Sequence, residues 1–177
     1  MLSIVTLFCK HFKNTEIQNN IQNTKEESYQ EGFVRDLFVN ILGYTLNPQP
    51  DFNFVLEKKN INDTKKADGA VVFNNKVLAV LELKDTNTSD LKTVEKQAFG
   101  YRYDNNQTCK YVIISNFEKL NFYIDNKESV EEFNLFTLSQ ERFYLLYLCL
   151  AKENLLSNIP LKLKEDSLSK EKDITEK

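Results

Sequence analysis

Apolar side chains recur at helical intervals in four stretches of the chain. The spacing predicts helices over residues 2–13, 25–42, 91–102 and 139–156. Gly43 follows the second stretch as a helix stop. The polar segment 14–24 is predicted to be a loop or a frayed helix end, and the Lys- and Glu-rich segment from residue 162 onward an exposed helix or a linker.

Between residues 52 and 124 the apolar pattern shortens to a period near two, which is typical of strands. It predicts strands over residues 52–56, 67–73, 77–84, 110–115 and 120–124. Asn74, Asn75 and Lys76 divide the second strand from the third as a hairpin loop. Helices and strands in this order predict an α/β fold, a mixed central β-sheet flanked by helices.

The composition suits one folded domain and argues against several classes of protein. With 177 residues, 41% of them hydrophobic, the chain can bury one substantial core. Three cysteines without a C-x-x-C pair are typical of reduced thiols, and the apolar run 144–151 is too short to cross a membrane, so we expect a cytoplasmic protein. The single histidine, His11, argues against a histidine-metal nuclease, a zinc finger and a Ser-His-Asp hydrolase.

The candidate chemistry lies on the predicted hairpin. In the strand 77–84 the odd-numbered positions 77–83 form one apolar face, while Glu82 and Lys84 point together to the other side. A carboxylate and an ammonium group therefore meet at the end of a hydrophobic strand.

The position of Asp68 depends on the register of the hairpin. A two-residue Asn-Asn turn would put Asp68 on the opposite face from Glu82. A three-residue loop, 74–76, pairs Phe73 with Val77 and sets Asp68 directly across from Glu82. We predict the three-residue loop.

Two facing carboxylates repel one another, and hard divalent cations take oxygen ligands. Asp68, Glu82 and the carbonyl of Leu83 therefore form a candidate Mg²⁺ site. Mg²⁺ keeps bound waters, and one of these is a candidate nucleophile that Lys84 would activate or hold in place. The net charge of −3 offers no basic surface for nucleic acid, but it does not exclude a cleft that gains positive charge from a bound metal.

At this point the sequence resembles the PD-(D/E)xK nuclease superfamily. Asp68, Glu82 and Lys84 stand in the places of its metal-binding Asp, second acid and lysine, and Ala67 stands where Pro is usual. Within the superfamily, the likeness is to the N-terminal nuclease domain of type IIG enzymes, in which a nuclease and a methyltransferase share one polypeptide. It runs from about Lys25 to Leu156 and implies a restriction-endonuclease-like α-β-β-β-α-β core.

Two further motifs match the family. Gln97 and Tyr101 look like its Q-x-x-x-Y motif, whose spacing stacks both side chains on one helix face, and the resemblance implies that Gln97 approaches the metal waters or the DNA phosphate. The family also places a Glu on the helix before the sheet. Glu27 fits that place best, as a further metal ligand, and Glu31, one turn away, is the alternative. Residues 111–116 match the family's strand after the helix.

The resemblance implies a Mg²⁺-dependent DNA endonuclease domain of a restriction-modification enzyme over residues 25–160. An N-terminal helix and loop, 1–24, precede it, and a charged linker or exposed helix, 161–177, follows it. The expected partners are double-stranded DNA and methyltransferase and target-recognition domains, in cis or as a separate chain, because this chain shows no S-adenosylmethionine-binding motif. The alternative is a nuclease-like module that no longer cuts and serves in DNA contact or assembly.

Overall fold

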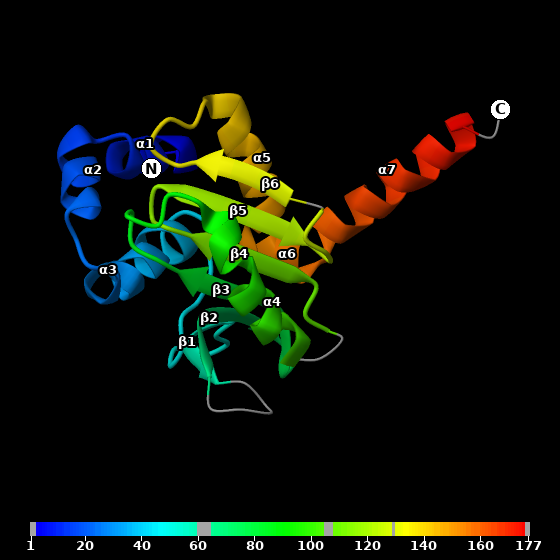
Figure 1. Ribbon diagram of the computed structural model, residues 1–177, viewed down its shortest axis with the longest axis horizontal. Helices are drawn as coiled ribbons and strands as arrows, with labels where there is room; N and C mark the ends of the chain where they lie inside the picture. Colours follow the sequence, from blue (N-terminus) through cyan, green and yellow to red (C-terminus); the bar gives the residue numbers. More distant parts are fainter. Residues whose placement is uncertain (1–2, 60–64, 105–107, 129, 176–177) are drawn as a thin grey trace.

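A six-stranded mixed sheet forms the centre of the molecule in the computed structural model, which describes residues 3–59, 65–104, 108–128 and 130–175 (Figure 1). Its strands are β1 (Phe54–Lys59), β2 (Lys66–Phe73), β3 (Lys76–Leu83), β4 (Tyr111–Ser115), β5 (Lys119–Ile124) and β6 (Val130–Asn134). The spatial order follows the sequence, and neighbours are antiparallel except for the parallel pair β3 and β4. The mixed α/β sheet expected from the sequence is confirmed.

Helices cover both faces of this sheet. One core cluster joins the sheet to α1 (Ile4–Phe12), α2 (Thr15–Gln22), α3 (Glu26–Phe33), η1 (Val34–Val39), α5 (Gln140–Leu150) and α6 (Lys152–Leu156). A second cluster joins the other face to η2 (Leu91–Val94) and α4 (Glu95–Asp104). The last helix, α7 (Ile159–Thr175), projects away from the body (Figure 1). No helix in the described ranges combines the length and apolar character needed to span a membrane.

The two central strands are buried on both faces, which explains their sequence. On β4, Ile113 packs in the larger cluster and Ile114 in the cluster under α4. On β3, Leu81 and Val80 divide in the same way. Strands covered on both faces have nearly continuous apolar runs rather than an alternation of polar and apolar residues.

The segment 14–24 differs from its prediction, because it contains the helix α2. The Asn14 side chain caps this helix by accepting hydrogen bonds from the N–H groups of Glu16 (3.0 Å) and Ile17 (3.2 Å). Ile21, one turn after Ile17, is buried in the core. A cap and one apolar pair therefore define a helix that the surrounding polar residues obscure in the sequence.

The long helix predicted over residues 25–42 changes its winding halfway. After α3, the π-helix η1 leads to N–H···O bonds from Asn40 to Arg35 and from Leu42 to Leu37, both 2.9 Å. Gly43 ends the segment with φ at +84°, so the predicted helix stop is confirmed.

The helix predicted over residues 139–156 is interrupted. Ala151, with ψ at 137°, separates α5 from α6. The edge strand β6 is absent from the sequence prediction, because Phe133 is its one buried residue and two glutamates precede it. An edge strand that faces solvent carries too few apolar positions to show a period of two.

The hairpin between β2 and β3 corrects the predicted loop. Phe73 pairs with Lys76 across a two-residue turn, in which Asn74 and Asn75 have φ values of 50° and 60°. Positive φ at both central positions is what the tight hairpin turn requires, and Asn tolerates it. The predicted three-residue loop is therefore wrong.

A β-bulge then restores the register that the turn would have lost. Val72 pairs with Val77 but Val71 pairs with Ala79, so Leu78 is an extra residue on β3. The bulge also corrects the predicted apolar face, because Val77 packs in the cluster under α4 while Leu78 packs with Ala79 on the other face. From the bulge onward the pairing runs through Gly69 and Leu81.

Candidate functional site

Asp68 lies on β2 where the hairpin register brings it across from Glu82. Gly69 pairs with Leu81 in the antiparallel ladder, so the next position along the two strands sets Asp68 across from Glu82. The N–H of Leu83 donates a hydrogen bond of 2.7 Å to Asp68 Oδ2, which fixes the carboxylate against the end of β3. The facing predicted from a longer loop is therefore reached through the bulge instead.

Gly69, the residue after Asp68, leaves room for the ring of Phe54 to pack directly against β2. A Cβ at Gly69 would lie 2.8 Å from a ring carbon of Phe54, closer than side-chain atoms approach one another. Phe54 is fully buried in the larger core cluster. Its ring thus supports the strand at the residue next to the candidate ligand.

Glu82 is a buried acid whose two carboxylate oxygens differ in their hydrogen bonding within the described ranges. Its side chain is 2% exposed. Glu82 Oε1 accepts hydrogen bonds from Lys84 Nζ at 2.6 Å and from Gln97 Nε2 at 2.7 Å. Glu82 Oε2 is buried and has no hydrogen-bond partner in the described part of the chain. A buried carboxylate oxygen without a donor is costly unless a cation or a proton meets it.

Lys84 stands at the edge of the site rather than inside it. The backbone N–H of Lys84 donates a hydrogen bond of 2.9 Å to the backbone carbonyl of Ser115. This bond continues the β3–β4 pairing by one residue beyond the strand. The side chain is 24% exposed, so the ammonium group reaches solvent while it contacts Glu82. Its second acidic neighbour is Glu26, whose Oε1 lies 3.9 Å from Lys84 Nζ.

Gln97 and Tyr101 lie together on α4, as the predicted spacing requires. Gln97 Nε2 donates to Tyr101 Oη at 3.0 Å as well as to Glu82. The amide group therefore orients the Glu82 carboxylate from the α4 side of the sheet. In this structure Gln97 contacts the acid itself.

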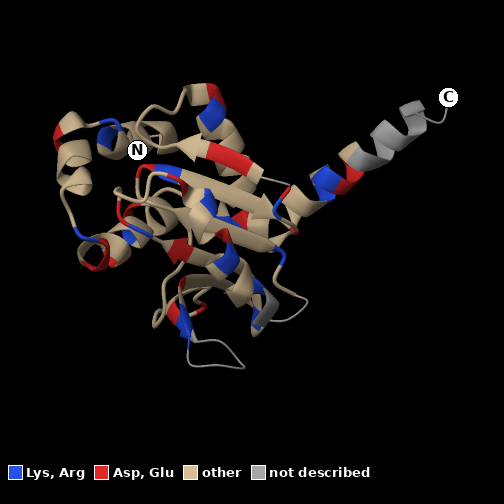
Figure 2. Cartoon of the chain, in the orientation of Figure 1, with Lys and Arg blue, Asp and Glu red and all other residues tan. Residues whose placement is uncertain are grey.

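Of the acids on helix α3, Glu26 lies beside the cluster, rather than Glu27, which the sequence favours, or its alternative Glu31. Figure 2 shows acidic residues at the start of α3 and at the end of β3, and the arrowhead of β3 points towards α3 in Figure 1. Glu26 is half-buried beside Lys84, whereas Glu27 is exposed and Glu31 is paired with Arg35 at 2.7 Å. Helix periodicity cannot separate these three residues, because it does not fix the rotation of α3 against the sheet.

Gln30, one turn after Glu26, is a member of the cluster that the sequence prediction did not include. Its Nε2 donates to Glu26 Oε1 at 3.0 Å and to Asp68 Oδ1 at 3.4 Å. A spacing of four residues from an acid was the available signal, and it is common on surface helices.

Burial and mutual repulsion set the charge states of the acids. Burial, followed by the charge of Asp68, raises the pKa of Glu82 to about 7. Burial also raises the pKa of Asp68, although the hydrogen bond from Leu83 opposes it. For Lys84, burial lowers the pKa, but the hydrogen bond and charge of Glu82 and the charges of Glu26 and Asp68 outweigh it, so the pKa is raised.

Asp68 and Glu82 are the side chains that could hold a hard cation. Each presents a carboxylate, and one buried oxygen of Glu82 has no partner within the described ranges. Among the residues that the structure describes, no group of three or more His, Cys, Asp or Glu side chains is placed to hold a metal. Two carboxylates are nevertheless a usual protein contribution to Mg²⁺, whose other ligands are waters and substrate phosphates. The donor set therefore fits this ion.

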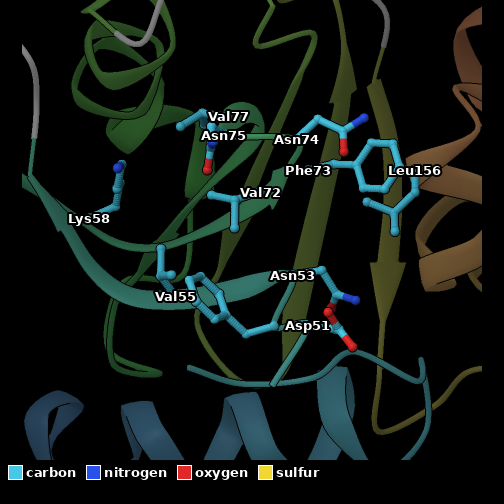
Figure 3. Close-up of a pocket in the computed structure, with 11 residues that line it drawn as sticks. Asp51, Asn53, Val55, Lys58, Val72, Phe73, Asn74, Asn75, Val77 and Leu156 are labelled. Carbon is cyan, nitrogen blue, oxygen red and sulfur yellow. The ribbon is translucent and has the colours of Figure 1, made fainter. Parts of the chain in front are cut away.

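A cavity of about 640 Å³ lies away from these acids. Its lining includes Val55 on β1, Val72 on β2, the Asn74–Asn75 turn and Leu156 (Figure 3). None of the acid cluster borders it. The carboxylates, the ammonium group and the amides, rather than this cavity, carry the candidate chemistry.

Comparisons with known proteins give one structural likeness. No family model and no curated protein matches the chain. A solved structure described as the type IIG restriction endonuclease BpuSI is similar, with a TM-score of 0.43 and 13% sequence identity. The match covers 82% of this chain and 17% of that chain. The candidate function rests on the residues of the site.

Proposed function

We propose that this chain is a Mg²⁺-dependent nuclease domain that hydrolyses phosphodiester bonds in DNA. The observation that carries the proposal is the convergence of Asp68, Glu82 and Lys84 at the end of a buried strand. Within that group, Glu82 Oε2 is buried and has no hydrogen-bond partner among the described residues. An ordinary surface salt bridge leaves no such atom, because its carboxylate remains hydrated.

In this proposal Asp68 and Glu82 hold the cation, and the carbonyl of Leu83 is a further proposed ligand. Bound Mg²⁺ would supply Lewis-acid stabilisation of the charge that develops on the phosphoryl oxygens, and it would lower the pKa of a bound water. Glu26, which lies nearer the group than Glu27, is the upstream acid of the proposed site.

Lys84 acts as a cation rather than as a base. Its raised pKa keeps the ammonium group protonated at neutral pH. Because Nζ is both anchored on Glu82 and partly exposed, it can donate a hydrogen bond to a phosphate oxygen or to the attacking water. Gln97 serves the same chemistry indirectly, since its amide holds the Glu82 carboxylate in place.

The proposal extends to a restriction-modification enzyme of the type IIG kind, on the strength of the motif resemblance. Methyltransferase and target-recognition domains would then act in cis or as a separate chain. Acidic and basic residues are interspersed over the helices and strands (Figure 2), and the net charge is −3. Sequence-specific contacts to base edges are therefore assigned to the partner domains.

The test is nicking of supercoiled plasmid DNA by the purified chain with Mg²⁺ and with a chelator. The parent should nick DNA with Mg²⁺ alone. Asp68→Ala, Glu82→Ala and Lys84→Ala should each lower the rate by roughly 100-fold or more, because each removes a charge placed for the reaction.

Lys76→Ala is the matched control for the lysine, since Lys76 lies exposed at the other end of β3. It should leave the rate within about twofold of the parent, in keeping with an exposed position away from the site. If the parent nicks no DNA and Mg²⁺ leaves its melting temperature unchanged, the chain is a nuclease-like module without activity. If one of the three variants cuts at the parental rate, that residue has been assigned wrongly.

A further inference from the structure

We propose that Gln30 is a positioning residue that presets the acid group for its cation, an inference that rests on the proposed function. Gln30 lies on the helix α3, whereas Asp68 and Glu82 lie on the β2–β3 hairpin. Its side-chain amide links that helix to the candidate metal ligand Asp68 on the hairpin.

The geometry of the amide fits this role. A glutamine Nε2 carries two hydrogen atoms, and here it faces two carboxylates from different elements. It lies 3.0 Å from Glu26 Oε1 and 3.4 Å from Asp68 Oδ1. Because both neighbours are acceptors, the NH₂ group and not the carbonyl oxygen must point at them. One side chain thereby places a shared donor between two like charges.

Both oxygens of Asp68 are consequently held. The backbone N–H of Leu83 binds Oδ2 at 2.7 Å, and Gln30 binds Oδ1. With a donor on each oxygen, the plane of the carboxylate is fixed before any ligand arrives. Without Gln30 the group can rotate about its last torsion, which is a broad one.

Gln30 itself stands on a helix that is fastened in place. Its neighbour Tyr29 donates to Asp36 Oδ2 at 2.8 Å and lies 2.9 Å from His11 Nε2. The Tyr29 ring packs edge-on against Phe117, with centroids 5.1 Å apart. The first turns of α3 are therefore tied to α1, to η1 and to the residues after β4, so the amide approaches the acids from a fixed base.

This role predicts that replacing Gln30 changes the affinity for Mg²⁺ and not the cleavage rate at saturating Mg²⁺. Residues that orient a metal ligand without touching the metal typically change metal affinity by 10- to 100-fold when they are replaced. Loss of the Gln30 amide should weaken Mg²⁺ binding by about tenfold or more in this way. The rate at saturating Mg²⁺ should stay within about threefold of the parent, because Asp68, Glu82 and Lys84 remain.

The experiment compares the full-length parent with Gln30→Met, which keeps the shape of the side chain and removes its donors. Gln30→Ala is the second variant, since Ala favours a helix and cannot strain the site. Gln49→Met is the matched control, at an exposed loop position. Calorimetric titration of each protein with Mg²⁺ alone gives the dissociation constant. Melting temperatures without metal, and plasmid nicking at increasing Mg²⁺, complete the comparison.

The expected result is a dissociation constant about ten times higher or more in both Gln30 variants, with parental binding in Gln49→Met and melting temperatures close to the parent. Parental Mg²⁺ binding in either folded Gln30 variant would overturn the inference and leave the proposed function intact. A lower rate at saturating Mg²⁺ with unchanged affinity would also overturn it, since Gln30 would then act on DNA. A parent that binds no Mg²⁺ would refute the proposed function and this inference together.

Discussion

Glu82 is a buried acid whose pKa is raised well above its ordinary value. It is 2% exposed and shares its surroundings with Asp68, so burial and repulsion raise its pKa to about 7. The free carboxyl group in an unfolded chain titrates near 4.5. A carboxylate in this environment reduces stability, and strongly shifted acids of this kind are concentrated at functional sites.

The pH dependence of stability should report this carboxyl group. Between about pH 4.5 and 7 the folded protein holds a proton that the unfolded chain has released. The stabilisation that comes from this extra bound proton is fully present below about pH 4.5 and is lost as the pH rises through about 7. In urea unfolding without metal, the free energy of the parent should therefore fall relative to Glu82→Gln, by at most about 1.4 kcal/mol per pH unit.

Comparison with Glu82→Gln cancels the titration of the acids remote from Glu82, because both proteins share them. The variant should be the more stable protein at pH 8 without metal, although it should not cut DNA. Parallel pH profiles for the two proteins would show that Glu82 titrates as an exposed acid, which contradicts its burial.

At the residue scale, the sequence could predict what strand and helix periods determine. Alternation along β3 places Glu82 and Lys84 on one side, and a four-residue spacing places Gln97 beside Tyr101. Glu26 and Gln30 could not be identified in this way. Their roles depend on the rotation of α3 against the sheet, which tertiary packing decides and a one-dimensional pattern does not contain.

At the scale of elements, the β2–β3 hairpin shows how two local features combine. The turn at Asn74 and Asn75 alone would shift Asp68 out of line with Glu82, and the bulge at Leu78 restores the alignment. The sequence prediction placed Asp68 across from Glu82 by assuming a three-residue loop. In the structure a two-residue turn and a β-bulge give the same alignment. A bulge has no strong composition signal, so the loop was the simpler hypothesis.

Asn75 provides a test of the turn. Its φ of 60° lies in the left-handed region. Asn75→Val should destabilise the protein by about 1–2 kcal/mol, because a branched side chain is strained there, whereas Asn75→Gly should be neutral or slightly stabilising. Urea unfolding measures both.

The turn lies at the opposite end of β3 from Lys84, so plasmid nicking by the folded Asn75→Val protein should stay near the parental rate. Equal stability of the Val and Gly variants would argue against the two-residue turn and favour a loop without positive φ.

At the scale of the whole molecule, the first helix belongs to the larger core cluster, together with α3 and one face of β3. The sequence predicts an N-terminal helix and loop over residues 1–24, before the nuclease domain. In the structure Phe12 is fully buried, with its ring 5.0 Å from Phe8 and 6.3 Å from Phe33 on α3. The sequence shows the helical spacing of Phe8 and Phe12, but it does not show that they pack in one core with Phe33 of α3.

This packing predicts a large effect at Phe12. Phe12→Ala should lower the free energy of unfolding by about 3–5 kcal/mol through lost burial and a cavity. Leu7→Ala, at a position on the same helix that is 37% exposed, should cost well under half as much. Urea unfolding distinguishes them, and equal effects would mean that α1 is not part of the core.

The most direct test of the central claim is to locate the cation. Crystals of the parent grown with Mn²⁺, a Mg²⁺ substitute with anomalous scattering, should show one anomalous peak within bonding distance of both the Asp68 and the Glu82 carboxylates. The same peak should be missing from crystals of Glu82→Gln. Mn²⁺ bound elsewhere, in a protein that still cuts DNA, would contradict the account.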